Sequence, residues 1–66
     1  MTVTANGKTR RVAVGMTVLE FLTQSDLVPE RIVLEHNGAP LRRDRFAKTV
    51  LQAGDTLEIA QMVGGG

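Results

Sequence analysis

Two Asn-Gly pairs, at residues 6–7 and 37–38, constrain the fold of this 66-residue chain more than any other feature. Each pair lies between short runs of alternating or β-branched residues, and Asn followed by Gly is a preferred centre for a two-residue hairpin turn. Such turns need a positive φ at both central residues, which Asn and Gly adopt at low cost. The chain is therefore predicted to contain two β-hairpins, one in each half.

The first hairpin is predicted to have one apolar face. Val3 and Ala5 alternate with polar residues before the turn, and Val12 and Val14 alternate with their neighbours after it. Because successive side chains of a strand point to opposite faces, we expect these four residues to face the core. Gly15 is expected to end the second strand.

A short helix is predicted to follow, beginning at Thr17 and ending near Ser25-Asp26, before Pro29. Thr17 and Glu20 have the spacing of a capping box, in which each side chain accepts a hydrogen bond from the other residue's backbone N–H. The apolar residues of this segment share one helical stripe that would face the core. They are Val18, Leu19, Phe21 and Leu22.

The second half of the chain is predicted to supply three more strands, at residues 31–36, 39–41 and 56–62. Pro40 suits an edge position in the middle one, because proline cannot donate a backbone hydrogen bond to a neighbouring strand. Strands before and after a single helix predict an α+β fold.

A turn of helix is predicted at residues 44–47, with Phe46 as a plug in the core and Val50 and Leu51 continuing it. In the last strand, a period of two places Leu57 and Ile59 toward the core. The opposite face of that strand would carry Glu58, Ala60 and Met62.

Composition indicates one small globular domain, which we place at residues 1–62, followed by a flexible tail at residues 63–66. The absence of cysteine excludes disulfides, thiol nucleophiles and thiolate metal sites. No apolar run approaches the roughly 20 residues that span a bilayer, and the N-terminal residues lack the pattern of a secretory signal. We therefore expect a cytoplasmic protein with no membrane partner.

Basic residues gather at Arg42, Arg43, Arg45 and Lys48, but the net charge of the chain is only +1. The two phenylalanines are its only aromatic residues, and neither lies among exposed basic residues as a base-stacking platform would. A solvated or protein-facing basic surface is therefore predicted, with no nucleic acid partner.

The sequence contains no arrangement of side chains typical of a catalytic centre. His36 is its only histidine, and its acidic residues do not follow metal-ligand spacing. Ser25-Asp26-Leu27 has the wrong order for a phosphopantetheine attachment site. Neither a metal, nor a bound cofactor, nor a catalytic base is predicted.

Three glycines, at residues 64–66, end the chain directly after the last apolar segment. A glycine terminus has no side chain to block a narrow channel, and its backbone adopts nearly any combination of dihedrals. Such a terminus suits a chain whose own carboxylate enters the active site of another protein. A loose solvated tail is the alternative interpretation of the same residues.

The whole chain resembles the ThiS family, the sulfur carriers of thiamine thiazole biosynthesis with a ubiquitin-like β-grasp fold. The resemblance rests on residues 6–8, 17–22, 32–38 and 50–59 and on the glycine tail. Phe46 stands where relatives often carry tryptophan, a conservative exchange in a core plug. The resemblance implies a mixed sheet of four to five strands packed on one helix.

This resemblance also implies a mechanism in which the chain is a protein substrate and not an enzyme. An E1-like, ThiF-like adenylating enzyme would use ATP and Mg²⁺ to activate the Gly66 carboxylate. Sulfur from a cysteine desulfurase would displace AMP and leave a thiocarboxylate, which would donate its sulfur to a ThiG-like thiazole synthase.

Site residues follow from the same resemblance and from the predicted strand faces. Gly66 would carry the chemistry, and Gly64 and Gly65 would thread the channel. Ala60, Met62 and Val63 are predicted to contact the adenylating enzyme. Electrostatic steering toward an acidic patch on the partner is assigned to Arg42, Arg43 and Arg45.

Several other functions remain open at this point. The small subunit of molybdopterin synthase shares the fold, the glycine tail and the thiocarboxylate, but tends to be longer. The sequence also fits a carrier for cysteine or other sulfur-containing metabolites, and a ubiquitin-like modifier that ends in an isopeptide bond. A plain β-grasp binding module would not need the glycine terminus.

Overall fold

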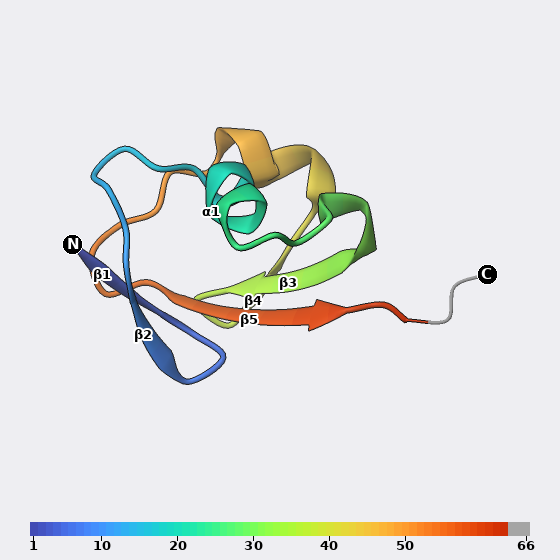
Figure 1. Ribbon diagram of the computed structural model, residues 1–66, viewed down its shortest axis with the longest axis horizontal. Helices are drawn as coiled ribbons and strands as arrows, with labels where there is room; N and C mark the ends of the chain where they lie inside the picture. The colour runs from blue at the N-terminus through green and yellow to red at the C-terminus, as the bar shows by residue number, and fades with distance from the viewer. Residues whose placement is uncertain (64–66) are drawn as a thin grey trace.

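The computed structural model describes residues 1–63, which form one five-stranded sheet packed against a single α-helix (Figure 1). In chain order the elements are β1 (Thr2–Ala5), β2 (Lys8–Arg11), α1 (Val18–Gln24), η1 (Pro29–Arg31), β3 (Ile32–His36), β4 (Ala39–Leu41), η2 (Arg43–Lys48) and β5 (Thr56–Gln61), where η denotes a 3-10 helix. The predicted α+β class and the number of strands are confirmed. Between residues 1 and 63 no helix is long and apolar enough to cross a membrane.

The sheet is mixed, with the strand order β2-β1-β5-β3-β4. β5 runs parallel to β1 on one side and antiparallel to β3 on the other, and the two hairpins complete the sheet at its edges. The last strand therefore lies at the centre, hydrogen-bonded on both sides. β4, which contains Pro40, is an edge strand as predicted.

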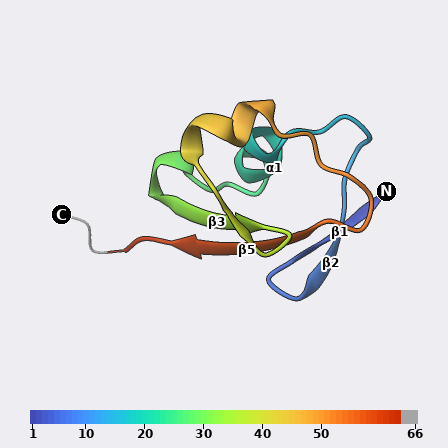
Figure 2. The same ribbon diagram turned by 180° about the vertical axis from the view of Figure 1, so that it is seen from behind.

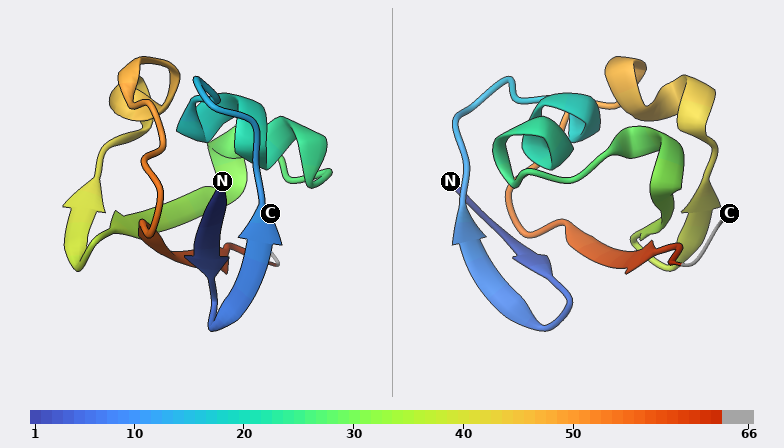
Figure 3. Two further views of the ribbon diagram at one scale, coloured as in Figure 1. Left: turned by 90° about the vertical axis from the view of Figure 1, so that its left-hand side faces the viewer. Right: turned by 45° about the vertical axis from the view of Figure 1, so that its right-hand side comes forward.

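The helix and the 3-10 turns cover only one side of the sheet. α1 and η2 lie together above it in Figure 1, and the views in Figures 2 and 3 agree. In these views no part of the described chain lies against the opposite side, which we call the open face. Side chains on β5 alternate between a buried face and this open one.

Both Asn-Gly pairs form the predicted hairpin turns. Asn6 and Gly7 have φ angles of 50° and 80°, and Asn37 and Gly38 have φ angles of 52° and 84°. The Asn6 side chain also binds β5, because its Oδ1 accepts from the N–H of Ile59 at 2.7 Å and its Nδ2 donates to the Ile59 carbonyl at 3.0 Å. The first turn is thereby attached to the central strand.

The second strand is shorter than predicted, and Val14 does not face the core. β2 ends at Arg11, and Val12 is buried just beyond it. Residues 13–16 then form a turn closed by a hydrogen bond from Met16 N–H to the Ala13 carbonyl, which leaves Val14 86% exposed. Strand alternation no longer applies once the chain turns toward α1, so the prediction for Val14 is wrong.

The helix begins as its sequence predicts. Glu20 N–H donates to Thr17 Oγ1 at 3.1 Å, and Thr17 N–H donates to Glu20 Oε1 at 2.9 Å, which completes the capping box. Val18, Phe21 and Leu22 are buried. The helix C-cap is Ser25, in agreement with the predicted end.

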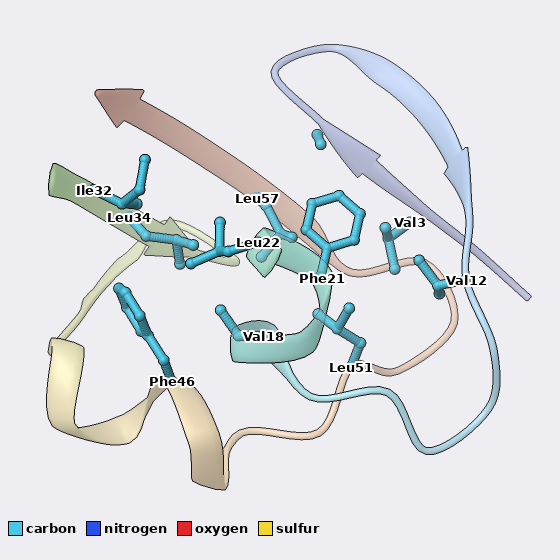
Figure 4. Packing of buried hydrophobic residues seen from close by; sticks show 11 residues of the cluster. Val3, Val12, Val18, Phe21, Leu22, Ile32, Leu34, Phe46, Leu51 and Leu57 are labelled. Carbon is cyan, nitrogen blue, oxygen red and sulfur yellow. The ribbon is translucent and has the colours of Figure 1, made fainter. Parts of the chain in front are cut away.

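The core lies between α1, η2 and the covered face of the sheet (Figure 4). Phe46 is 1% exposed and fills the plug position predicted for it, and Leu51 is equally buried. Val50 does not join them. It pairs with Thr17 in an isolated β-bridge, and this extended backbone turns neighbouring side chains to opposite sides, so Leu51 points inward and Val50 outward.

Candidate functional site at the C-terminal strand

β5 leads the chain directly to the residues with predicted functions. The pairing with β3 continues one residue beyond the strand, since Met62 N–H donates a 2.8 Å hydrogen bond to the Arg31 carbonyl. Val63 follows and is 85% exposed. The predicted reactive and threading glycines, residues 64–66, lie outside the described residues, so their roles stay predictions.

An exposed apolar patch borders this end of β5 on the open face. Val33 of β3 lies directly opposite Ala60, and both are exposed. Met62, two residues further along the chain, is 48% exposed. Leu57 is fully buried and Ile59 packs against the core, so the predicted division of the strand into two faces is confirmed.

Two carboxylates lie next to the apolar patch. Glu35 of β3 and Glu58 of β5 are directly opposite one another, and both are exposed. With Val33, Ile59 and Ala60 they line a shallow hollow of about 250 Å³. Strand alternation predicted that Glu58 lies on the open face. That Glu35 lies beside it depends on the register between β3 and β5, which the sequence does not show.

The predicted steering arginines lie on η2 and just before it, on the covered side of the sheet (Figure 1). Arg43 has a structural contact there, because its guanidinium donates to the carbonyls of Pro29 at 3.1 Å and Glu30 at 2.8 Å. Its contacts join η2 to η1. The structure therefore separates these arginines from the apolar patch, which lies on the opposite face.

Arg42 and Arg45 differ from Arg43 in their surroundings. Among residues 1–63, the only hydrogen bond or salt bridge of the Arg42 side chain is a 3.5 Å approach of its Nε to Asp44 Oδ1, and both side chains are largely exposed. Arg45 has no side-chain hydrogen bond or salt bridge within the same range. These two side chains remain available to a partner, while Arg43 is engaged within the fold.

Comparison with known proteins decides the family. The ThiS family model matches residues 3–66. The chain belongs to the ThiS family. Among solved structures, the crystal structure of the thiamine biosynthesis protein ThiS from Geobacter metallireducens is 35% identical, with a TM-score of 0.84 and complete coverage of both chains. An NMR solution structure of a thiamine biosynthesis protein from the same organism, also 35% identical, has a TM-score of 0.81 and covers all of this chain and 88% of that one.

These similarities confirm the predicted family and its β-grasp fold. A curated relative, the thiazole synthase of Magnetococcus marinus, is 30% identical over 66 residues. The match covers the whole of this chain and 20% of that relative, so this ThiS-family chain spans about one fifth of the relative's length.

A polar cluster at the other end of β5 was not predicted. His36 Nε2 lies 2.8 Å from Asp55 Oδ2, and Asn37 Nδ2 donates to Asp55 Oδ1 at 3.1 Å. Gln52 N–H adds a 2.8 Å bond to the same carboxylate, and Thr56 N–H donates to Asn37 Oδ1. The cluster fastens the second hairpin to the start of β5.

The pKa of Asp55 reflects competing effects in this cluster. Burial of the carboxyl acts to raise its pKa, but hydrogen bonds from His36, the Gln52 amide and Asn37, with the charge of His36, outweigh burial and lower the pKa below 3.8. His36 therefore has a hydrogen-bonded structural position. Its partner is 19 residues away in sequence, so local pattern gave no signal of the contact.

A larger hollow, of about 360 Å³, lies on the covered side, among the first hairpin, α1 and β5. Its cationic residues are Lys8 and Arg10, and the Arg10 guanidinium is already placed 5.2 Å from the Phe21 ring centroid and 3.3 Å from Ser25 Oγ. This hollow is on the face opposite the apolar patch. Within residues 1–63, no three His, Asp or Glu side chains gather as metal ligands would.

Proposed function

We propose that the chain is the sulfur carrier for thiazole formation in thiamine biosynthesis, with Gly66 as the reactive terminus. The observation that carries this proposal is the ThiS family match, which extends over residues 3–66 and so includes the three glycines. Similarity to a thiamine biosynthesis protein, in both its crystal and its NMR structure, favours this pathway over molybdopterin synthesis.

The chemistry explains why the carrier needs an activating enzyme. A carboxylate resists attack by a sulfur nucleophile because its negative charge repels the nucleophile and oxide is a poor leaving group. In the proposed reaction, a Gly66 carboxylate oxygen attacks the α-phosphorus of ATP and releases pyrophosphate. The resulting acyl-adenylate has AMP as a good leaving group. ATP and Mg²⁺ belong to the E1-like, ThiF-like enzyme, and the carrier itself holds no cofactor.

Sulfur transfer would follow on the same carbonyl carbon. A persulfide sulfur from a cysteine desulfurase attacks this carbon and expels AMP, forming an acyl disulfide. A second thiol then attacks the cysteine-derived sulfur of this acyl disulfide, so that the thiocarboxylate leaves and a disulfide forms between the two thiols. Because this sequence has no cysteine, both thiols come from partners and the sulfur is carried on the chain terminus. In this scheme the chain is a protein co-substrate in the cytoplasm and not an enzyme.

Delivery of the terminus is the proposed task of β5. Its central place in the sheet and the Met62 to Arg31 hydrogen bond give the glycines a fixed starting point. Ala60, Met62 and Val63 would then contact the adenylating enzyme while Gly64 and Gly65 enter its channel. An exposed apolar patch beside the tail is consistent with this docking role.

A ThiG-like thiazole synthase is the proposed acceptor of the sulfur. The supporting observation is that the whole chain resembles one fifth of the Magnetococcus marinus thiazole synthase. In that relative the resembling segment shares one polypeptide with the rest of the protein. We infer that the present chain meets a thiazole synthase as a partner.

Carrier-dependent exchange between pyrophosphate and ATP tests the proposed activation step. The parent chain should support exchange by the cognate ThiF-type enzyme, and a chain with one alanine added after Gly66 should not, because the added Cβ blocks the channel. Equal exchange with the extended chain would show that the terminus is not the site. No exchange with the parent, under conditions in which the enzyme accepts another ThiS-family carrier, would overturn the proposed function.

A further inference from the structure

The carboxylates of Glu35 and Glu58 are placed together by the sheet register in a way that disfavours the isolated fold. Directly opposed residues of an antiparallel pair have Cβ atoms about 4.5–5.5 Å apart, and like charges there are destabilising. Among residues 1–63 neither carboxylate has a hydrogen-bond or salt-bridge partner. The fold therefore leaves two adjacent negative charges without a compensating cation in the described chain.

The surroundings of this pair are those of a docking surface. Val33 and Ala60 are exposed next to it, and together with the two glutamates they line the 250 Å³ hollow. The patch is continuous with Met62, so it extends along β5 toward the terminus. A second copy of this chain is a poor occupant, because a two-fold contact through this face would bring four carboxylates together.

We propose that the Glu35–Glu58 pair, with Val33 and Ala60 beside it, binds an arginine side chain at the channel entrance of the adenylating enzyme. This inference rests on the proposed function. A guanidinium has a planar fork of N–H donors that suits carboxylates, and it is the cation of choice at interfaces. Its stem would pack on the apolar part of the hollow.

Charge complementarity indicates the adenylating enzyme as the occupant. That enzyme has to hold the triphosphate of ATP next to a carboxylate, so the approach to its active site requires cationic side chains. If β5 delivers the terminus to that active site, the open face of the strand would approach this cationic surface. An acidic pair beside the strand that delivers the terminus would set how the carrier is positioned on the enzyme, and it would also strengthen binding.

The test uses a double substitution that removes both charges and keeps both side-chain shapes, Glu35→Gln with Glu58→Gln. A matched control removes two charges elsewhere, Asp26→Asn with Glu30→Gln, on exposed side chains that have no hydrogen-bond or salt-bridge partner among residues 1–63. Calorimetry against the purified ThiF-type enzyme, at low and high salt, measures the dissociation constant for each chain.

We expect the Glu35/Glu58 variant to bind the adenylating enzyme at least about tenfold more weakly than the parent, with a smaller dependence on salt. The control pair should change affinity by less than about threefold. The free variant should also unfold at a higher urea concentration than the parent, because the repulsion has been removed. Weaker binding together with higher stability is the combination that a purely structural role would not produce.

Three results would overturn the inference, and they differ from failure of the proposed function. If the Glu35/Glu58 variant binds the adenylating enzyme as tightly as the control variant does, and the parent is adenylated, the acidic pair has no role in binding. The carrier function then stands. Weaker binding to a thiazole synthase alone assigns the pair to that enzyme instead. A lower urea midpoint shows that the pair stabilises the free fold. If the parent itself is not adenylated, the proposed function fails and the inference fails with it.

Discussion

Asp55 Oδ2 lies 2.8 Å from Nε2 of His36, and this contact joins the end of β3 to the residue just before β5. The carboxylate also receives hydrogen bonds from Asn37 and the Gln52 amide. β5 is the strand that leads to the functional terminus. The contact therefore helps to set where that strand begins in the sheet.

The Asp55 cluster predicts a specific loss of stability in acid. Because the pKa of Asp55 is lower in the folded state than its ordinary value of 3.8, the unfolded chain binds this proton more readily. The stabilisation from the ionised Asp55 is fully present above pH 3.8, and it is lost as the pH falls through the folded-state pKa. Urea unfolding of the parent and of Asp55→Asn between pH 7 and pH 2 measures it.

Asp55→Asn should lower the free energy of unfolding by about 1–3 kcal/mol at pH 7, because one accepting carboxylate oxygen becomes an NH2 donor and the charge that strengthens the buried hydrogen bonds is lost. The difference from the parent should shrink at low pH. Asp26→Asn, at an exposed aspartate with no hydrogen-bond or salt-bridge partner among residues 1–63, is the control. A difference between Asp55→Asn and parent that stays constant from pH 7 to pH 2 would contradict the linkage.

Phe46 should be among the most sensitive core positions. Phe46→Ala removes a side chain that is 1% exposed, which typically costs about 3–5 kcal/mol. A 66-residue domain has a total stability of roughly 3–10 kcal/mol, so this variant is expected to be partly unfolded at 25 °C. Val50→Ala, at a 44% exposed site four residues away, should change stability by less than about 1 kcal/mol. Circular dichroism in urea compares the two, and equal losses would refute the assigned core.

Arg43 and Arg45 should separate a structural role from a steering role. Arg43→Ala removes two hydrogen bonds to backbone carbonyls of η1 and should lower the free energy of unfolding by about 1 kcal/mol. Arg45→Ala should leave stability within about 0.5 kcal/mol of the parent. If Arg45 steers the encounter, its loss lowers the association rate at low salt and not at high salt. An unchanged rate at both salt concentrations would exclude that role.

Gly65→Ala should nearly abolish adenylation while the domain stays folded. The added Cβ would meet the wall of a channel that accepts only backbone, and glycine at this position carries no core contact in the proposed scheme. Carrier-dependent pyrophosphate exchange gives the activity, and the urea midpoint gives the stability. Normal exchange by this variant would eliminate the steric argument.

Local signals in the sequence predicted most of the fold. The Asn-Gly turns, the Thr17–Glu20 capping box and the plug at Phe46 each depend on residues close together in the chain, and all three were correct. The predictions for Val14 and Val50 were wrong for different reasons. The prediction for Val14 extended strand alternation into a turn. The prediction for Val50 placed two adjacent residues in the core, whereas the extended backbone at the isolated bridge turns their side chains to opposite sides.

Features that depend on strand register could not be predicted from one sequence. Glu35 meets Glu58, and His36 meets Asp55, only because β3 and β5 align in one particular register across more than 18 residues of chain. The open face of β5 was predictable because it needs only the period of two. The separation of the η2 arginines from that face depends on tertiary packing, which no local pattern contains.

The central claim is that sulfur is loaded on Gly66, and peptide mapping after alkylation tests it most directly. The chain is incubated with its ThiF-type enzyme, ATP, a cysteine desulfurase and cysteine, and then treated with iodoacetamide. Intact mass alone is insufficient, because replacing oxygen by sulfur adds nearly the mass of one methionine oxidation and the chain has three methionines. The account predicts an ATP-dependent alkylated fragment that ends at Gly66. A terminus that stays unmodified, while the same enzymes load another ThiS-family carrier, would contradict it.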